Sequence, residues 1–281
     1  MKKLIFIGIL AVGLFASSAQ AALVTDNLLV SLDTGNYSSG QTWTDQAPFK
    51  ANDAYLGTSA SDTVEDPTFN AGNAVFEFSS ADTGDRIVRP VDEGTWGTFD
   101  AGYLYNNTTF SVETWLKVDP NTGYMCPLDL RTGGGRQGFL LKCDVALKTV
   151  TAQVCAGWTA QTAILSSWDK TIVNHLAVTV QSDGTTDEIK MYLNGQLDST
   201  TPITINPSDK HVYFDDLTLG CAKAGSLTDL DGEIAAFRLY ADVLTADEVA
   251  QNYAEGYNIP EPATVVLLAL GGLGILGRKR K

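Results

Sequence analysis

Alternation of apolar and polar side chains with a period of two is the feature of this sequence that most constrains its fold. Residues 109–118 show it clearly: Phe110, Val112, Thr114, Leu116 and Val118 share one face, and Ser111, Glu113, Trp115 and Lys117 share the other. This period is typical of a half-buried β-strand, whose successive side chains point to opposite faces. Gly, Asn, Asp, Ser and Thr interrupt the chain often, as in all-β proteins. The sequence therefore predicts an all-β fold.

A second pair of alternating runs predicts a hairpin. Leu176, Val178 and Val180 alternate with small or polar residues, and the run 188–193 does the same. The Asp-Gly pair at 183–184 lies between the two runs and is a strong turn signal. We predict a two-sheet antiparallel sandwich with a core supplied by Phe110, Val112, Leu116, Val178, Val180, Ile189, Met191, Leu193, Leu219, Ile234 and Phe237.

One short helix is predicted near the end of this domain. Thr245 and Glu248 have the spacing of a capping box, in which each residue satisfies a backbone N–H of the other. Val249 and Tyr253 fall on one face of the turns that follow, and Gly256 suits a left-handed stop. We expect a helix over 245–255 that packs against the sandwich.

Residues 1–21 have the three parts of a secretory signal peptide. Lys2 and Lys3 precede the uncharged, apolar residues 4–16, and Ala19 and Ala21 form a small-x-small cleavage site. The apolar stretch is shorter than the about 20 residues that a retained transmembrane helix needs. Cleavage by signal peptidase is therefore expected.

Residues 260–281 form a second targeting signal. Pro260-Glu261-Pro262 precede the uncharged residues 263–277, and the chain ends in Arg278, Lys279, Arg280 and Lys281. The uncharged stretch spans about 22 Å as a helix, so it predicts a short, transient inner-membrane anchor whose basic end stays cytoplasmic. This end closely resembles the PEP-CTERM sorting signal of Gram-negative bacteria. The resemblance implies cleavage by an exosortase-type protease near Pro260–Pro262 and delivery to the cell surface or extracellular matrix.

Between these ends, residues 22–259 are predicted to be one domain, because no linker or repeat divides them. They carry 32 acidic and 13 basic side chains, while the whole chain has a formal charge of −14. A domain with this much negative charge repels phosphate backbones, which argues against nucleic acid as a partner. The chain has only two histidines, which argues against a multi-histidine zinc site.

Several runs in this body resemble the laminin-G-like family of concanavalin A-like jelly-roll sandwiches. They are residues 74–78 followed by 82–87, the central run 110–117, residues 175–179 and 192–195, and residues 232–234, 238–240 and 244–253. The central run has an aromatic-x-aliphatic-Glu-x-Trp pattern. The resemblance implies a jelly-roll fold, and a fold alone does not establish a function.

The motifs that would support catalysis are missing from the sequence. The glucanase branch of this family carries Glu-x-Asp-x-x-Glu, and Glu113 has no such partners. There is also no Gly-x-Ser-x-Gly elbow. We expect the protein not to be an enzyme, with a divergent glycoside hydrolase as the alternative.

A bound calcium ion is not favoured. Related sandwiches often place an acidic calcium ligand just after the Gly-x-Ile of the closing strand, where this chain has Ala235 and Ala236. Asp229, Asp231 and Glu233 are the candidate metal ligands, although they lack the full pattern of a calcium loop.

Exposed aromatic rings are the candidate sites for a sugar ligand, because they stack on the C–H edges of sugars. Trp96 and Trp158 are the loop candidates, and Trp115 with Glu113 is the sheet-face candidate; the alternative is that Trp115 is ordinary core. Export permits disulfides among Cys126, Cys143, Cys155 and Cys221, but alternation places Cys143 and Cys155 on opposite faces if both lie in one hairpin.

Two main functional hypotheses remain. The protein is either an exported, noncatalytic surface or matrix module that binds glycan or another exported polymer, or a structural matrix component without a discrete ligand site.

Overall fold

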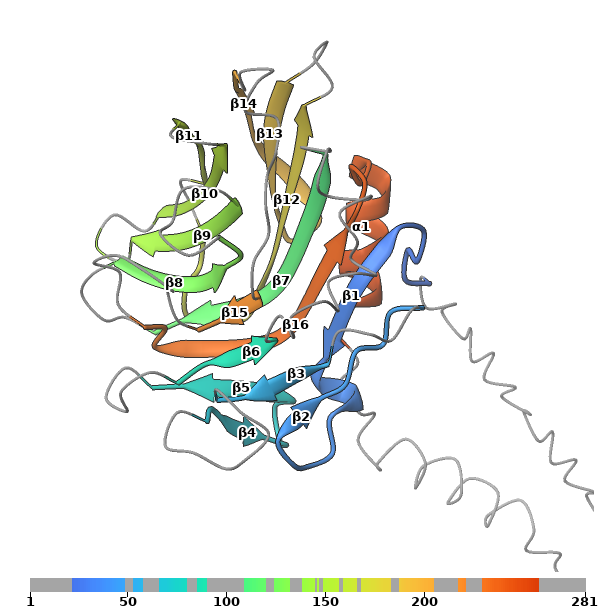
Figure 1. Cartoon of the computed structure of the whole chain (residues 1–281), viewed down its shortest axis with the longest axis vertical. Coiled ribbons are helices and arrows are strands. Elements are labelled where there is room, and N and C mark those ends of the chain that lie inside the picture. The colour runs from blue at the N-terminus through green and yellow to red at the C-terminus, as the bar shows by residue number, and fades with distance from the viewer. Residues whose placement is uncertain are drawn as a thin grey trace, which may run out of the picture.

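The computed structural model describes residues 22–48, 53–57, 66–79, 85–89, 109–119, 124–131, 138–144, 146, 149–156, 159–165, 168–182, 187–204, 217–220 and 229–257. These residues form two β-sheets that face each other, with one short α-helix on the outside of one of them (Figure 1). The predicted all-β sandwich is confirmed.

The first sheet, called sheet A below, follows the order β14 (Gln196–Pro202), β13 (Asp187–Leu193), β12 (Asn174–Ser182), β7 (Phe110–Val118), β16 (Gly232–Tyr240), β5 (Val75–Phe78) and β4 (Thr68–Asn70), with β1 (Leu28–Asp33) also paired to β16. The second sheet, sheet B, follows the order β11 (Thr159–Leu165), β10 (Thr149–Ala156), β9 (Gly138–Asp144), β8 (Tyr124–Asp129), β15 (Leu217–Leu219), β6 (Ile87–Arg89), β3 (Ala54–Leu56) and β2 (Thr42–Trp43). The paired strands of both sheets run antiparallel.

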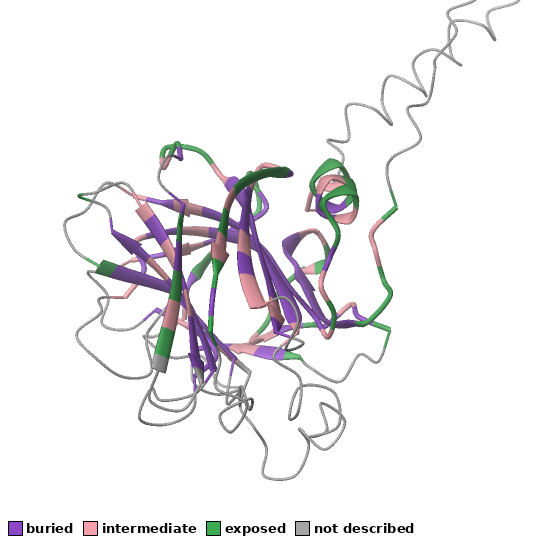
Figure 2. Ribbon diagram, turned by 90° about the horizontal axis from the view of Figure 1, so that it is seen from above, coloured by how far each residue is buried: buried purple, intermediate pink, exposed green. Residues whose placement is uncertain are grey.

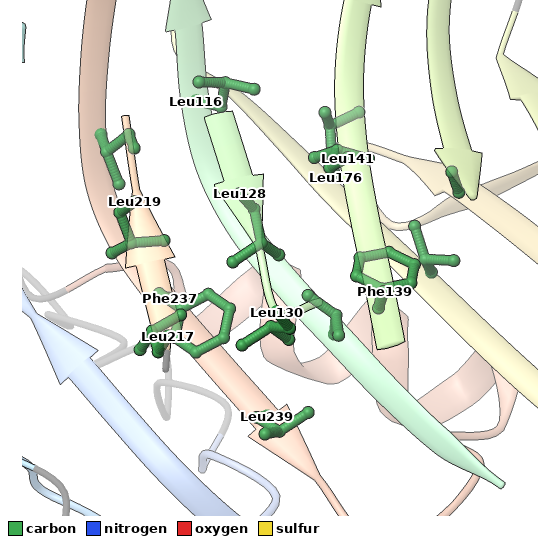
Figure 3. Close-up of a cluster of buried hydrophobic side chains, with 14 of the residues drawn as sticks. Leu116, Leu128, Leu130, Phe139, Leu141, Leu176, Leu217, Leu219, Phe237 and Leu239 are labelled. Carbon is green, nitrogen blue, oxygen red and sulfur yellow. The ribbon is translucent and has the colours of Figure 1, made fainter. Parts of the chain in front are cut away.

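The core lies between the inner faces of the two sheets (Figure 3). Leu116, Phe237 and Leu239 from sheet A meet Leu128 and Phe139 from sheet B in one buried cluster. Ten of the eleven predicted core residues are buried in this cluster, and Leu193 is partly buried against it. The predicted hairpin is also present as β12 and β13, with Leu176 opposite Leu193, while its Asp-Gly turn lies outside the described residues.

The alternation predicted for 109–118 is the observed pattern of β7. Phe110, Val112 and Leu116 point into the core, whereas Glu113 and Trp115 point to the outer face of sheet A. Both faces are nevertheless buried along most of this strand, and buried residues gather in the strands at the centre of the molecule (Figure 2). Some other part of the chain must therefore cover the outer face of β7.

That cover includes helix α1 (Ala246–Glu255), which confirms the predicted helix and its capping box. The Thr245 hydroxyl accepts a hydrogen bond from the Glu248 backbone N–H, and the Glu248 side chain accepts one from the Thr245 N–H. The inward face of α1 carries Val249 and Asn252, which are buried, while Tyr253 stays 44% exposed. The helix is therefore amphipathic, as predicted, with Asn252 rather than Tyr253 as its second buried residue.

The beginning of the described chain docks onto the same helix. The Val24 N–H donates to Asn252 Oδ1 at 2.9 Å, and Gln251 Nε2 donates to the Ala22 carbonyl. Residues 22–24 and α1 are thus held together although more than 220 residues separate them.

Cys143 and Cys155 occupy different faces of sheet B. Cys143 lies in the core, opposite Val150, whereas Cys155 pairs with Gly138 at the other end of the β9–β10 ladder. Both are free thiols, so the two do not bond each other. Cys221 lies outside the described residues.

Candidate functional site

A pocket of about 330 Å³ opens at one end of sheet A. Because β16 runs antiparallel to both β5 and β7, the ends of β5 and β7 lie beside the beginning of β16. Gly232 is the junction, since it pairs with Phe78 on one side and with Val118 on the other. The pocket forms where these three strand ends meet.

Carboxylates dominate the lining of this pocket. Asp66, Thr68, Glu77, Phe78, Ser79, Asp85, Asp119, Gly232 and Glu233 line it. Five of these nine residues are Asp or Glu, so the pocket is rich in hydrogen-bond acceptors and repels anions.

Neighbouring side chains orient several of the carboxylates. Lys117 Nζ donates to Glu233 Oε1 and lies 3.3 Å from Asp119 Oδ1. The hydrogen bond to Glu233 is the largest cause of a raised pKa for Lys117, which keeps this lysine protonated. Asn70 Nδ2 donates to Glu77 Oε1 at 2.7 Å. These contacts hold the acceptors in place before any ligand arrives.

The pocket also depends on the missing side chain of Gly232. A Cβ at this position would lie 2.2 Å from the Lys117 carbonyl oxygen and 3.0 Å from the Val118 Cα. Glycine therefore lets the start of β16 come close to the end of β7. This close approach brings Glu233 and Asp119 to the same Lys117 ammonium group.

The three metal candidates from the sequence do not assemble into a binding site. Only Glu233 of the three lines the pocket. Asp231 contributes its backbone carbonyl to a hydrogen bond from the Asp119 N–H at 2.8 Å. Among the described residues, no group of three or more His, Cys, Asp or Glu side chains could hold a metal ion. Asp229, Asp231 and Glu233 are thus not brought together as metal ligands.

The prediction that Glu113 and Trp115 form an exposed sheet-face platform is wrong. The Glu113 residue is 0% exposed and Trp115 is 3% exposed. The Trp115 ring packs against the His175 imidazole, with centroids 4.3 Å apart, and the Arg238 guanidinium lies over it at 4.5 Å. The sequence showed correctly that this face is polar, but α1 and Tyr257 cover it, so a sugar cannot stack there.

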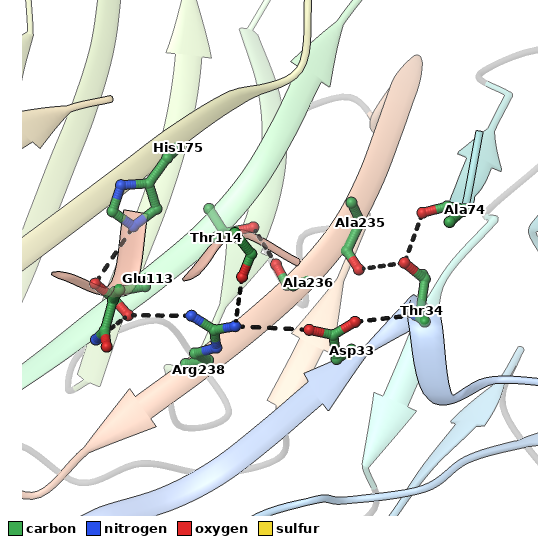
Figure 4. A network of polar contacts seen from close by, with 12 residues as sticks. Asp33, Thr34, Ala74, Glu113, Thr114, His175, Ala235, Ala236 and Arg238 are labelled. Carbon is green, nitrogen blue, oxygen red and sulfur yellow. Dashed lines mark hydrogen bonds and ion pairs between the residues drawn. The ribbon is translucent and has the colours of Figure 1, made fainter. Parts of the chain in front are cut away.

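Glu113 instead belongs to a buried polar network on sheet A that also contains His175 and Arg238 (Figure 4). Its carboxylate accepts a hydrogen bond from Asn252 Nδ2 at 2.9 Å and from the Tyr240 hydroxyl at 3.4 Å. His175 Nε2 lies 3.3 Å from the other carboxylate oxygen, and an Arg238 nitrogen lies 4.0 Å from the first. Burial is the largest cause of a raised pKa for Tyr240, which stays a neutral donor. The network ties α1 to the sheet.

The remaining sequence candidates lie outside the described residues, and the two other tryptophans are buried. Trp43 is buried in the core and Trp168 is 9% exposed. Trp96 and Trp158 lie outside the described residues, as do Ala19, Ala21, the Pro260–Pro262 run and the four basic residues 278–281. In the described part of the chain, no helix has the length and apolarity to cross a membrane.

Sequence reasoning missed most of the pocket residues. Asp119 directly follows β7, and Glu77 lies next to the end of β5, so polar residues at strand ends were the available signal. The signal could not be read without knowing which strand ends are neighbours.

Comparison with known proteins places the chain by family and by fold. A family model described as the "Concanavalin A-like lectin/glucanases superfamily" matches residues 91–250, and a "PEP-CTERM protein-sorting motif" matches residues 258–281. No curated protein sequence matches the chain.

Solved structures with the same fold include two botulinum neurotoxin chains and a trypanosomal enzyme. A structure of botulinum neurotoxin type C, reported with a dependence of cell entry on two ganglioside molecules, has a TM-score of 0.59 and 16% identity over 82% of this chain and 51% of that chain. The binding domain of botulinum neurotoxin DC in complex with rat synaptotagmin II has a TM-score of 0.60 and 15% identity over 82% and 52%. Trypanosoma rangeli sialidase in complex with sialic acid has a TM-score of 0.58 and 16% identity over 86% and 35%. This chain thus spans about half of each neurotoxin chain and about a third of the sialidase chain. The similarity shows the fold.

Proposed function

This chain belongs to the concanavalin A-like lectin/glucanases superfamily and ends in a PEP-CTERM sorting motif, and on that premise we propose that it is an exported, noncatalytic cell-surface or matrix module that binds glycan. The acceptor-rich pocket at the end of sheet A is the observation that carries the proposal.

Export follows from the two ends of the chain. The sorting motif implies export and cell-surface sorting with processing by an exosortase. The secretory pattern of residues 1–21 adds signal peptidase as a second processing enzyme. The mature protein then begins near Ala22 and ends near Pro260, and mass spectrometry of the exported form should find both ends missing. Recovery of the full-length chain from the cytoplasm would contradict this.

The chemistry of the pocket favours a neutral, hydroxyl-rich glycan. Sugar hydroxyls donate hydrogen bonds, and Asp66, Glu77 and Glu233 supply the acceptors. The neurotoxin and sialidase neighbours are described with gangliosides and sialic acid, but an anionic sugar would meet like charge in this pocket. We therefore expect neutral polysaccharides to bind better than sialylated or uronic ones.

Binding rather than cleavage is supported by the roles that these carboxylates already have. Glu233 is paired with Lys117, and Glu77 accepts from Asn70. A glycosidase needs one carboxylic acid to donate a proton and a second carboxylate to act as nucleophile or base. The sequence also lacks the glutamate and aspartate motif of the glucanase branch.

A glycan array probed with the purified exported protein tests the proposal. The protein should bind neutral glycans on the array. The Glu77→Gln variant should bind them at least about tenfold more weakly, since a hydrogen bond to a charged acceptor contributes about 1.5–3 kcal/mol. Glu188→Gln is the matched control, because Glu188 lies on β13, pairs with Lys190 and does not line the pocket.

Other outcomes would change the proposal in defined ways. Retention of no glycan would favour the structural matrix component, and hydrolysis abolished by one carboxylate substitution would favour the divergent glycoside hydrolase. Binding that survives Glu77→Gln but is lost in Trp96→Ala or Trp158→Ala would move the site to those loops, whose role stays a prediction.

A further inference from the structure

The outer face of sheet A changes from polar to apolar directly beside the pocket. Glu233 of β16 lies between Glu77 of β5 and Lys117 of β7, and these three side chains form a polar row. Two residues further along each strand, on the same face, the next row is buried and apolar and consists of Val75, Ala235 and Trp115. Side chains two residues apart on one face of a strand lie about 7 Å apart. The apolar row is therefore a close neighbour of the pocket.

Tyr257 covers this apolar row. It is partly exposed, packs against the row, and presents its ring to Trp115 in an edge-on arrangement with the centroids 6.4 Å apart. Burial is the largest cause of a raised pKa for the Tyr257 hydroxyl, and the negative charge of Glu233 also raises it, as expected for a ring close to the polar row. Tyr257 thus places a partly exposed aromatic ring beside the carboxylates of the pocket.

Tyr253 presents a second ring on the same side of the molecule. The ring stacks on the His175 imidazole, with centroids 5.6 Å apart and an interplanar angle of 23°. It also rests against the turn between β13 and β14, since a Cβ on Gly195 would lie 2.9 Å from Tyr253 Cδ1. Tyr253 is nevertheless 44% exposed. Its ring is held in place by buried neighbours and still reaches solvent.

The two tyrosines are joined by the buried rings of His175 and Trp115. These two rings lie 4.3 Å apart and belong to opposite residues of β12 and β7. The aromatic row Tyr253, His175, Trp115 and Tyr257 therefore runs across the strands of sheet A toward β16 and β5, where the pocket lies. The distance from β12 to β5 is three strand spacings, or about 14 Å. This distance is longer than a single sugar ring.

We propose that Tyr253 and Tyr257 extend the pocket into a binding surface for several consecutive sugar units, so that the ligand is a neutral polysaccharide chain and not a single sugar. This inference rests on the proposed glycan-binding function. Each unit of such a chain carries C–H edges that stack on a tyrosine ring and hydroxyls that donate to carboxylates. A neutral sugar chain therefore suits both the aromatic row and the acceptor-rich pocket.

Binding of length series of neutral oligosaccharides to the purified exported protein tests this inference. The probes are glucan, mannan and galactan oligosaccharides, each from the monosaccharide to the octasaccharide. We expect affinity to rise with length in the series that binds. Tyr253→Ala should weaken binding of the octasaccharide about three- to tenfold, the equivalent of one aromatic contact, and leave binding of the shortest bound member unchanged.

Matched variants separate stacking from a general effect on the fold. Tyr257→Ala should also weaken binding of the octasaccharide about three- to tenfold, whereas Tyr257→Phe, which keeps the ring, should bind like the native protein. Tyr124→Ala is the control, since Tyr124 is a 52% exposed tyrosine on β8 of the other sheet, and its affinities should not change. Thermal melting identifies the variants that are folded, and Tyr253→Ala decides the outcome if Tyr257→Ala is not.

The possible failures of the two proposals can be told apart. Equal affinity for short and long members, or native affinity for the octasaccharide in folded Tyr253→Ala, would overturn the extended surface. If Glu77→Gln still weakens binding in that case, the pocket remains the glycan site. Retention of no oligosaccharide by the native protein would overturn both proposals.

Discussion

Glu113→Gln is the substitution that should most clearly expose how α1 is held on sheet A. The change keeps the shape of the side chain and removes its charge. In the native network the Glu113 carboxylate accepts from Asn252 and Tyr240 and lies near two basic groups, His175 and Arg238. Arg238 is 2% exposed, and its remaining acidic neighbour would be Asp33, at 3.6 Å.

The expected loss of unfolding free energy is about 3 kcal/mol. Removing one partner of a buried ion pair typically costs about 3–5 kcal/mol, because the other charge stays buried without compensation. Asp33 keeps part of that compensation, and the glutamine oxygen still accepts one hydrogen bond, so the low end applies. A loss of this size is a large part of the about 5–15 kcal/mol that stabilises an ordinary domain.

Urea titration followed by circular dichroism and tryptophan fluorescence measures this loss. Trp115 lies under Arg238 and should report the change locally. Glu188→Gln is again the control: its carboxylate is partly exposed and its pair with Lys190 should contribute less than about 1 kcal/mol. A loss below about 1 kcal/mol for Glu113→Gln would refute the view that this buried charge network holds α1 in place.

Four further predictions follow from buried positions of the domain. Leu116→Ala removes a fully buried core side chain and should lower the unfolding free energy by about 2–4 kcal/mol in urea titrations. Gly195→Ala should cost about 1–3 kcal/mol in the same assay, because Gly195 has a φ of +76° and a Cβ there would lie 2.9 Å from Tyr253 Cδ1. Burial raises the pKa of Tyr240, so its contribution to the unfolding free energy should be fully present below about pH 10. The contribution should fall as the pH rises above this value, because the tyrosine ionises first in the unfolded chain. Urea titrations at rising pH should show this fall, and Tyr240→Phe should lessen it. Burial also raises the pKa of the Cys143 thiol, which iodoacetamide should alkylate in urea but not in the folded protein, as mass spectrometry can check.

Local patterns in the sequence predicted the strands β7, β12 and β13 and the helix α1. The two-residue alternation identified β7, β12 and β13 because a strand that separates two environments must alternate its side chains. The capping box located the start of α1 because its two hydrogen bonds lie within four residues of chain. Both signals are local, so one sequence suffices to read them.

A bulge in β16 shows a limit of prediction from local sequence patterns. Ile234 and Phe237 are three residues apart, which would place them on opposite faces of a regular strand, yet both lie in the core. The ladder between β16 and β7 shifts register between Ile234 and Ala236, and the extra residue turns Phe237 inward. Pairing with another strand, and not the local sequence, decided this.

The sequence by itself therefore determined the strands β7, β12 and β13, their inward faces, the helix α1 and the sorting motif at residues 258–281. Only the tertiary structure decided what covers the outward face and which strand ends meet. Glu113 and Trp115 alternate correctly to the outer face, but residues more than 130 positions later in the chain bury them. The pocket likewise joins Glu77, Asp119 and Glu233 from the ends of three strands that are distant in the sequence. Periodicity distinguishes the two faces of a strand, whereas long-range packing decides which of them meets solvent, another element or a ligand.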